Sequence, residues 1–263
     1  MSRHKVVVKN RTILPNIYLA FLTILMYLPV MVVIAYSFNQ SNQTIIWGGW
    51  TTDWYGEVFK DRDLIAALRN SLVLGAVSSI IAGIIGTLGA VGMSKSTSKD
   101  KGVVEYISML PIMIPEIILG MVFMAFFSLL HLPFGMVTLV LGHVAFCIPY
   151  IYMMVKARLI GIDRSLVEAA RDLGASGARA FFDITLPLIT PAIASGMLLS
   201  LAMSLDDVVV SIFVTGAKTN TLPIKIYTQL KTGVTPKINA LSTIMLLCTL
   251  LLVALSGLVR RKK

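Results

Sequence analysis

The chain has 263 residues, of which 56% are apolar and only 14% are charged, and its mean hydropathy is +0.83. A soluble domain carries about 25% charged residues, so this chain lacks the polar surface needed to cover a core in water. The composition therefore predicts an integral membrane protein. The net charge of +10 does not indicate a nucleic-acid-binding protein, because Lys and Arg occur in short blocks between apolar runs.

Six apolar runs are long enough to cross the hydrocarbon region of a bilayer, which takes about 20 helical residues. They are residues 13–38, 69–93, 106–130, 134–155, 188–214 and 238–259. The first run exceeds the roughly 7–15 apolar residues of a cleavable signal, so we expect it to be retained as a span. The sequence predicts an all-α fold with six transmembrane helices.

The blocks of Lys and Arg predict the orientation of these helices. With the N-terminus in the cytoplasm, 16 of the 23 basic residues fall in cytoplasmic segments, as the excess of positive charge inside requires. This orientation divides the chain into five predicted parts. They are a cytoplasmic N-terminus 1–12, a first transmembrane helix 13–38, an external loop 39–68, a core of five transmembrane helices 69–259 that includes an external loop 215–237, and a cytoplasmic tail 260–263.

Three acidic residues, Glu116, Asp206 and Asp207, lie inside apolar runs. Each costs about 2.5–3.5 kcal/mol at the centre of a membrane helix, so such a charge is normally paired, protonated or in contact with water. Pro111 and Pro115 precede Glu116, which predicts a kinked or broken helix there. The alternatives are a structural carboxylate at Glu116 and a helix cap or a salt bridge at one of the two aspartates.

The predicted cytoplasmic loop 156–187 contains the segment DRSLVEAARDLGASGARAFFDITLP. Ser165 and Glu168 have the spacing of a capping box that begins a helix, and Gly174 suits a helix end that requires positive φ. Ser176 is expected to cap a second short helix. One interpretation is an amphipathic helix on the inner leaflet. The small face of Ala169 and Ala170 instead favours close contact with a cytoplasmic partner protein.

The same loop resembles the EAA loop of ABC-importer permeases with the MetI-like fold. The resemblance rests on Glu168, Ala169, Ala170, Gly174 and the pair Leu186-Pro187. It implies that these residues form the coupling helix that sits in a cleft of a cytoplasmic ATPase homodimer. The chain itself has no G-x-x-x-x-G-K-[ST] motif, so ATP and Mg²⁺ are expected on that partner and this chain is expected to hold no cofactor and to be no enzyme.

Further stretches resemble the spermidine/putrescine permeases of PotC type. They are Trp54-Tyr55, Pro115-Glu116, the segment from His143 to Pro149, SLDDVVVS at 204–211, FVTG at 213–216 and LPIKIY at 222–227. This resemblance implies a multi-pass protein of the bacterial plasma membrane that imports polyamines. It also implies a second, related permease subunit and an external substrate-binding protein as partners.

A polyamine is a flexible apolar chain with cationic groups, and separated carboxylates and aromatic faces bind such a molecule well. Glu116, Asp206 and Asp207 are therefore candidate pathway residues, with Trp54 and Tyr227 as candidate aromatic faces. For Trp54, a position in the aromatic belt at the membrane interface is an equal alternative. His143 is expected to be a structural, hydrogen-bonded histidine.

Three alternative functions stay open to different degrees. One is a related importer for an oxyanion, whose pathway would be expected to contain Arg side chains or helix N-termini, whereas the charges here are acidic. A related importer for ferric ion is the other solute alternative. An ion-driven secondary carrier has no use for a coupling loop of this form. A membrane-embedded enzyme lacks a catalytic constellation. Spermidine and putrescine are both candidate substrates, each of the three carboxylates is a candidate for the pore, and pairing with a second copy of the chain is an alternative to pairing with a different permease.

Overall fold

The computed structural model describes residues 13–42, 46–163 and 165–261, so the predicted N-terminal segment 1–12 lies outside the described residues. Helices dominate the described part, which contains a single isolated β-bridge, between Asn39 and Trp50. The elements in chain order are α1 (Ile13–Tyr36), α2 (Asp53–Lys60), α3 (Arg62–Lys95), α4 (Lys101–Met113), α5 (Glu116–Leu129), α6 (Met136–Ile160), α7 (Ser165–Asp172), α8 (Gly177–Ala180), the π-helical turn η1 (Phe181–Thr185), α9 (Leu186–Asp206), α10 (Val209–Val214), α11 (Leu222–Thr232) and α12 (Pro236–Arg261).

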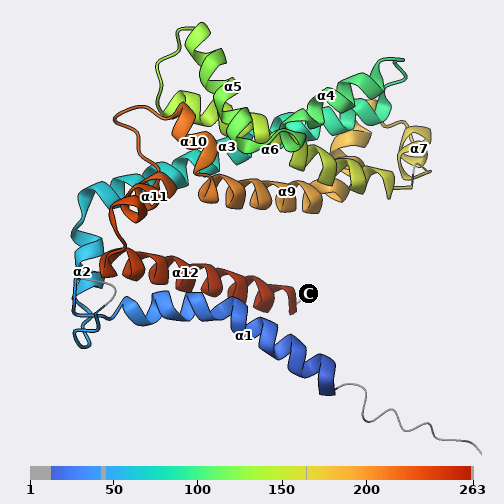
Figure 1. Cartoon of the computed structure of the whole chain (residues 1–263). Helices are drawn as coiled ribbons and strands as arrows, with labels where there is room; N and C mark the ends of the chain where they lie inside the picture. The colour runs from blue at the N-terminus through green and yellow to red at the C-terminus, as the bar shows by residue number, and fades with distance from the viewer. Residues whose placement is uncertain (1–12, 43–45, 164, 262–263) are drawn as a thin grey trace, which may run out of the picture. The chain divides into compact units, whose positions relative to one another are not determined.

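The helices form two compact units, one of which contains α1, α2 and α12. In this unit α1 packs along α12, and α12 also contacts α2 (Figure 1). Lys237 at the start of α12 donates a 2.6 Å hydrogen bond to Asp61 at the end of α2. The described side chains of α1 are mostly apolar and exposed, including Ile24 and Met26. A helix with this apolar exposed surface is suited to face lipid.

The second unit comprises residues 63–228, and its core lies between α3, α6 and α9. Small residues on α3 allow close approach of the other two helices. A Cβ atom at Gly86 would lie 3.1 Å from the Ile148 carbonyl oxygen, and one at Gly83 would lie 3.0 Å from the Met197 side chain. Small residues at helix contacts are typical of membrane proteins, where packing supplies much of the attraction between helices.

Four helices are each long and apolar enough to cross a membrane within the described residues, in α1, α3, α6 and the stretch from α8 to α9. The pair α4 and α5 together makes a fifth candidate span, but the two helices are bent by 109°. The predicted sixth span, residues 238–259, falls within α12. The described structure thus supports a polytopic all-α protein and leaves the count of six as a prediction.

The bend between α4 and α5 has a local cause in the sequence. Ile114 and Pro115 are both extended, with ψ values of 132° and 135°, and α5 begins at Glu116. A residue before proline avoids the helical region because of the proline ring, so Ile114 ends α4. Pro111 is accommodated inside α4, so the predicted break occurs at the second of the two prolines.

The predicted single helix over residues 188–214 is wrong, because the chain leaves the helical conformation at Asp207. The α9 helix ends at Asp206, Asp207 is extended with ψ of 122°, and α10 begins at Val209. Both predicted external loops also contain helices. The loop 39–68 includes α2 and the start of α3, and the loop 215–237 includes α11.

Candidate functional site

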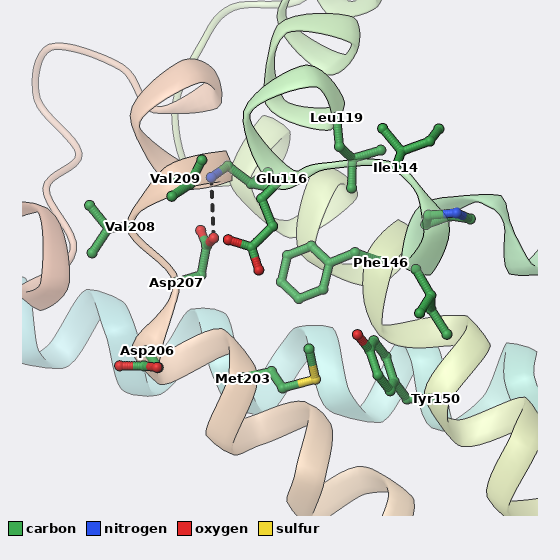
Figure 2. A pocket seen from close by; sticks show the side chains of 13 residues that line it. Ile114, Glu116, Leu119, Phe146, Tyr150, Met203, Asp206, Asp207, Val208 and Val209 are labelled. Carbon is green, nitrogen blue, oxygen red and sulfur yellow. Dashed lines mark hydrogen bonds between the residues drawn. The ribbon is translucent and has the colours of Figure 1, made fainter.

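A pocket of about 320 Å³ opens where both helix breaks meet α6, and its volume is within the range of about 300–1,000 Å³ common for small-molecule sites. Figure 2 shows the side chains that line it. Three of them are carboxylates and two are aromatic, and none of the lining residues is Lys, Arg or His. The lining residues are Pro111, Ile112, Ile114, Glu116, Leu119, Phe146, Tyr150, Met203, Asp206, Asp207, Val208, Val209 and Val210.

Glu116 reaches the pocket from the first turn of α5 (Figure 2). The break at Ile114 and Pro115 is what allows this, because it starts a new helix beside the pocket. A carboxylate in the first turn of a helix is stabilised by the positive end of the helix dipole. Glu116 therefore presents its carboxylate to the pocket from the positive end of α5.

Asp206 has the opposite helical environment, because it is the last residue of α9. The C-terminus of a helix carries partial negative charge, so a carboxylate there is destabilised unless a cation is nearby. Asp206 is exposed, and no hydrogen bond or ion pair to its carboxylate is found among the described residues. The negative potential at this end of the pocket suits a cationic ligand.

Asp207 is held by the protein itself. Its Oδ1 atom accepts a 3.1 Å hydrogen bond from Val210 N, and its Oδ2 atom accepts from Ser211 N at 2.8 Å and Ser211 Oγ at 2.6 Å. Asp207 lies one position before Val208, the N-cap residue of α10, and through these contacts its side chain caps the first turn of that helix. The alternative of a cap, left open for one of the two aspartates, is the arrangement that Asp207 adopts.

His143 on α6 lies behind Asp207 and is fully buried, with 0% of its surface exposed. Its Nδ1 atom is 2.7 Å from Ser204 Oγ, and its Nε2 atom is 3.0 Å from Ser211 Oγ and 3.4 Å from Asp207 Oδ2. Both ring nitrogens have partners, as expected of a structural histidine. The ring ties α6 to the end of α9 and to α10.

The aromatic side chains in the pocket come from α6 and not from the external loops. Phe146 and Tyr150 lie four residues apart on α6, so they share one face of the helix. Trp54 belongs to the unit of α1, α2 and α12, where its Nε1 atom donates a 2.8 Å hydrogen bond to Asn39 O. Tyr227 lies on α11 and is 40% exposed. Neither is among the residues that line the pocket.

The predicted coupling loop forms α7, α8 and η1. Gly174 has a φ of +87°, as the helix end predicted. Ser176 Oγ accepts a 3.3 Å hydrogen bond from Arg179 N and so caps α8, also as predicted. The start of α7 differs from the predicted capping box. Ser165 is the first residue of the helix and not its cap, and its N–H donates a 3.0 Å hydrogen bond to Asp163 Oδ1. This hydrogen bond lowers the pKa of Asp163.

The surface of this loop carries apolar side chains that nothing in the described chain covers. Leu173, directly after α7, is 90% exposed, and Leu166 and Phe182 are also exposed. Other contacts fix the loop to the helices on either side. Lys95 of α3 lies 5.8 Å from the centre of the Phe181 ring, and Arg158 Nε at the end of α6 donates a 3.0 Å hydrogen bond to Leu188 O on α9.

Apolar helices, broken spans beside an acidic pocket and an exposed loop between two spans together define a membrane permease. The chain belongs to the family of binding-protein-dependent transport system inner membrane components, whose model matches residues 78–262. It is thus a multi-pass bacterial membrane protein and the permease part of an importer. Nucleotide hydrolysis belongs to a separate ATPase partner, and a second permease and a substrate-binding protein are further partners of this kind of protein.

Curated relatives cover almost the whole chain. The spermidine/putrescine transport system permease protein PotC of Haemophilus influenzae is 38% identical over 253 residues, which are 96% of this chain and 98% of the relative. PotC of Escherichia coli K12 is 40% identical over 238 residues, 90% of either chain. The putrescine transport system permease protein PotI of Escherichia coli K12 is 39% identical and covers 84% of this chain and 81% of its own.

Solved structures with the same fold are more distant in sequence. A bacterial ABC transporter that imports the acidic polysaccharide alginate has a TM-score of 0.71 at 17% identity, with 95% of each chain covered. The MetNI methionine ABC transporter in an inward-facing conformation has a TM-score of 0.61 at 21% identity, with 76% of this chain and 96% of the other covered. These likenesses identify the fold as that of MetI-like ABC permeases.

Proposed function

We propose that this chain is the permease subunit of an ATP-driven importer for polyamines such as spermidine and putrescine. The observation that carries the proposal is the pocket in which Glu116, Asp206 and Asp207 come together without a basic side chain in its lining. The names of the PotC and PotI relatives support the same substrate class. An oxyanion is disfavoured by this lining, because its charge has the same sign as the carboxylates.

The pocket is proposed to be a weak site along the pathway and not the site that selects the substrate. Transport requires binding that is favourable enough for entry and weak enough for release. Selection of the solute then belongs to the external binding protein. Trp54 and Tyr227 are retained as proposed aromatic contacts on the external side, outside this pocket.

Coupling to the ATPase is proposed to occur through α7 and the residues around it. Glu168, Ala169 and Ala170 lie on α7, Gly174 follows it, and Leu186-Pro187 begin α9. The 90% exposure of Leu173 supports this role, since an apolar side chain in that position gains free energy when a partner covers it. Both termini and this loop are then cytoplasmic. The complete importer is proposed to contain an ATPase homodimer and a second, different permease.

Transport is proposed to proceed by alternating access. ATP binding closes the ATPase dimer and draws the two coupling loops together, which turns the pathway from inward-facing to outward-facing. The external protein then delivers the polyamine, and hydrolysis resets the pathway. A ligand shifts such an equilibrium only through its different affinity for the two states, so the ATPase must bind the two positions of α7 differently.

The substrate assignment is tested with the assembled complex in proteoliposomes. Labelled spermidine and putrescine should accumulate only when ATP and the binding protein are both present. Phosphate, sulfate and ferric ion, supplied with the same complex, should not accumulate. Accumulation of one of these ions in place of a polyamine would contradict the proposal, as would ATP-independent uptake driven by an ion gradient.

The coupling assignment is tested by Leu173→Glu and Glu168→Lys. Both side chains are exposed, so neither substitution should impair membrane insertion or the melting temperature of the permease. Each should prevent co-purification of the ATPase or abolish uptake. Normal uptake by both variants would show that the loop does not couple the two proteins.

A further inference from the structure

We propose that the three carboxylates of the pocket have different roles, which deepens the proposed function and depends on it. Glu116 and Asp206 contact the cationic substrate. Asp207 is a positioning residue that caps α10 and, together with His143, holds the end of α9 so that Asp206 faces the pocket. The aromatic face beside them, Phe146 and Tyr150, contacts the substrate between its cationic groups.

The first argument is the hydrogen-bond capacity of Asp207. Its two oxygens accept three hydrogen bonds from Val210 and Ser211, and Oδ2 also lies 3.4 Å from His143 Nε2. The side chain is only 7% exposed. Three of the roughly four acceptor sites of this carboxylate are therefore occupied by the protein, and its negative charge is shared with these donors, so Asp207 attracts a further cation less strongly than a carboxylate without such partners does.

Asp206 and Glu116 differ from Asp207 in the number of hydrogen bonds that their carboxylates accept. Both are exposed in the chain, and no hydrogen bond or ion pair to either carboxylate is found in the part of the chain that the structure describes. The environment of Asp206 also points to an external cation. Asp206 lies at the negative end of α9, where a bound cation relieves an unfavourable interaction.

The helix break explains how two adjacent aspartates take different roles. Because α9 ends at Asp206 and Asp207 is extended, the two side chains leave the backbone in different directions (Figure 2). The direction of Asp206 depends on the last turn of α9, in which Ser204 contacts His143. His143 thus fixes both sides of the break.

Phe146 and Tyr150 supply the remaining contact that a polyamine needs. They come from the same face of α6, and the Phe146 ring also lies 5.0 Å from the ring of His143. An aromatic face binds ammonium groups through its negative quadrupole and packs against methylene groups. In Figure 2 the Phe146 ring lies beside Glu116 and the Tyr150 ring lies beside Met203, across the pocket from Val208.

A matched pair of substitutions, Asp206→Asn and Asp207→Asn, tests this division in the assembled, reconstituted complex. Each removes one negative charge from adjacent positions. Asparagine retains one oxygen that can accept a hydrogen bond from the first turn of α10, so Asp207→Asn should lower polyamine uptake by about threefold, less than Asp206→Asn does. Asp206→Asn removes a charge that contacts the substrate and should reduce uptake by about tenfold or more. Asp206→Glu, which restores the charge, should restore most of the uptake.

Asp207→Ala completes the set, because alanine cannot cap α10. It should lower both uptake and the melting temperature of the complex, and the contrast with Asp207→Asn identifies the cap as the function of this residue. An Asp207→Asn variant that assembles normally but transports as poorly as Asp206→Asn would overturn the proposal. So would full activity of Asp206→Asn. If the wild-type complex transports no polyamine at all, it is the proposed function that fails.

Discussion

His143 Nε2 lies 3.4 Å from Asp207 Oδ2, and this buried contact joins the middle of α6 to the break between α9 and α10. Ser204 and Ser211 complete the contact from the two sides of the break, at 2.7 Å and 3.0 Å from the ring nitrogens. The network connects His143 to residues that lie 61 and 68 positions further along the chain. It stabilises an irregular backbone that the local sequence alone does not specify.

The first prediction concerns the ring of His143. His143→Leu should destabilise the permease by about 1–3 kcal/mol, because the hydroxyls of Ser204 and Ser211 lose a buried partner. The melting temperature of the purified complex should fall by several degrees, and uptake should fall with it. His143→Gln retains one donor and one acceptor and should lose less on both measures. Equal melting temperatures for the leucine and wild-type proteins would contradict the structural role of this network.

The second prediction concerns the aromatic face of the pocket. Tyr150→Leu should reduce polyamine uptake by about 2- to 30-fold, which corresponds to the roughly 0.5–2 kcal/mol of a cation–π contact. Tyr150→Phe preserves the ring and should remain close to wild type. Uptake is measured in proteoliposomes at equal amounts of assembled complex. A Tyr150→Phe variant as defective as Tyr150→Leu would mean that the hydroxyl, not the ring, is the part that matters.

Some features of the site followed from the sequence because a local rule dictates them. A residue that precedes proline avoids the helical conformation, so the break before Glu116 could be predicted from the presence of Pro115. Gly174 was predictable in the same way, since the end of a helix often requires positive φ. The EAA loop was identified by its resemblance to that of ABC-importer permeases, and its coupling role stays a prediction.

Other features depend on contacts between distant segments and were missed. No Gly or Pro marks the break at Asp207, which exists because Asp207 caps α10 and His143 supports it from another helix. The sequence favours Trp54 and Tyr227 of the external loops as the aromatic face, whereas Phe146 and Tyr150 line the pocket. Aromatic residues inside an apolar run do not stand out in the sequence, but the four-residue spacing of Phe146 and Tyr150 on one face of α6 is a signal for them.

The third prediction concerns the backbone of the coupling loop. Gly174 has a φ of +87°, and an alanine there costs about 1–2 kcal/mol because its Cβ crowds the backbone. Gly174→Ala should therefore weaken coupling, and Gly174→Val should do so more strongly. Gly161→Ala is the matched control, since Gly161 has a φ of −84° and an added Cβ would have an ordinary 3.6 Å contact. Uptake and ATPase co-purification should fall for Gly174 variants and remain unchanged for Gly161→Ala.

The last prediction concerns the link between α4 and α6. Lys156 Nζ lies 2.7 Å from Glu105 Oε2, and Tyr152 OH donates a 2.9 Å hydrogen bond to Glu105 Oε1. The α4 helix leads to the break before Glu116, and α6 leads to the coupling loop, so this ion pair connects the two functional regions through adjacent helices. Lys156→Met should reduce uptake several-fold while the ATPase remains bound, because a movement of the loop is then transmitted less well to α4.

A double-mutant cycle separates this link from a general loss of stability. The exchange of the two charges, Glu105→Lys with Lys156→Glu, should recover part of the uptake that either single charge reversal loses. The expected coupling free energy is about 1 kcal/mol, since both side chains remain partly exposed to solvent. Purely additive effects in the cycle would show that α4 and α6 are joined by their apolar packing alone, and that Glu105 and Lys156 contribute nothing specific to the movement between the coupling loop and the pocket.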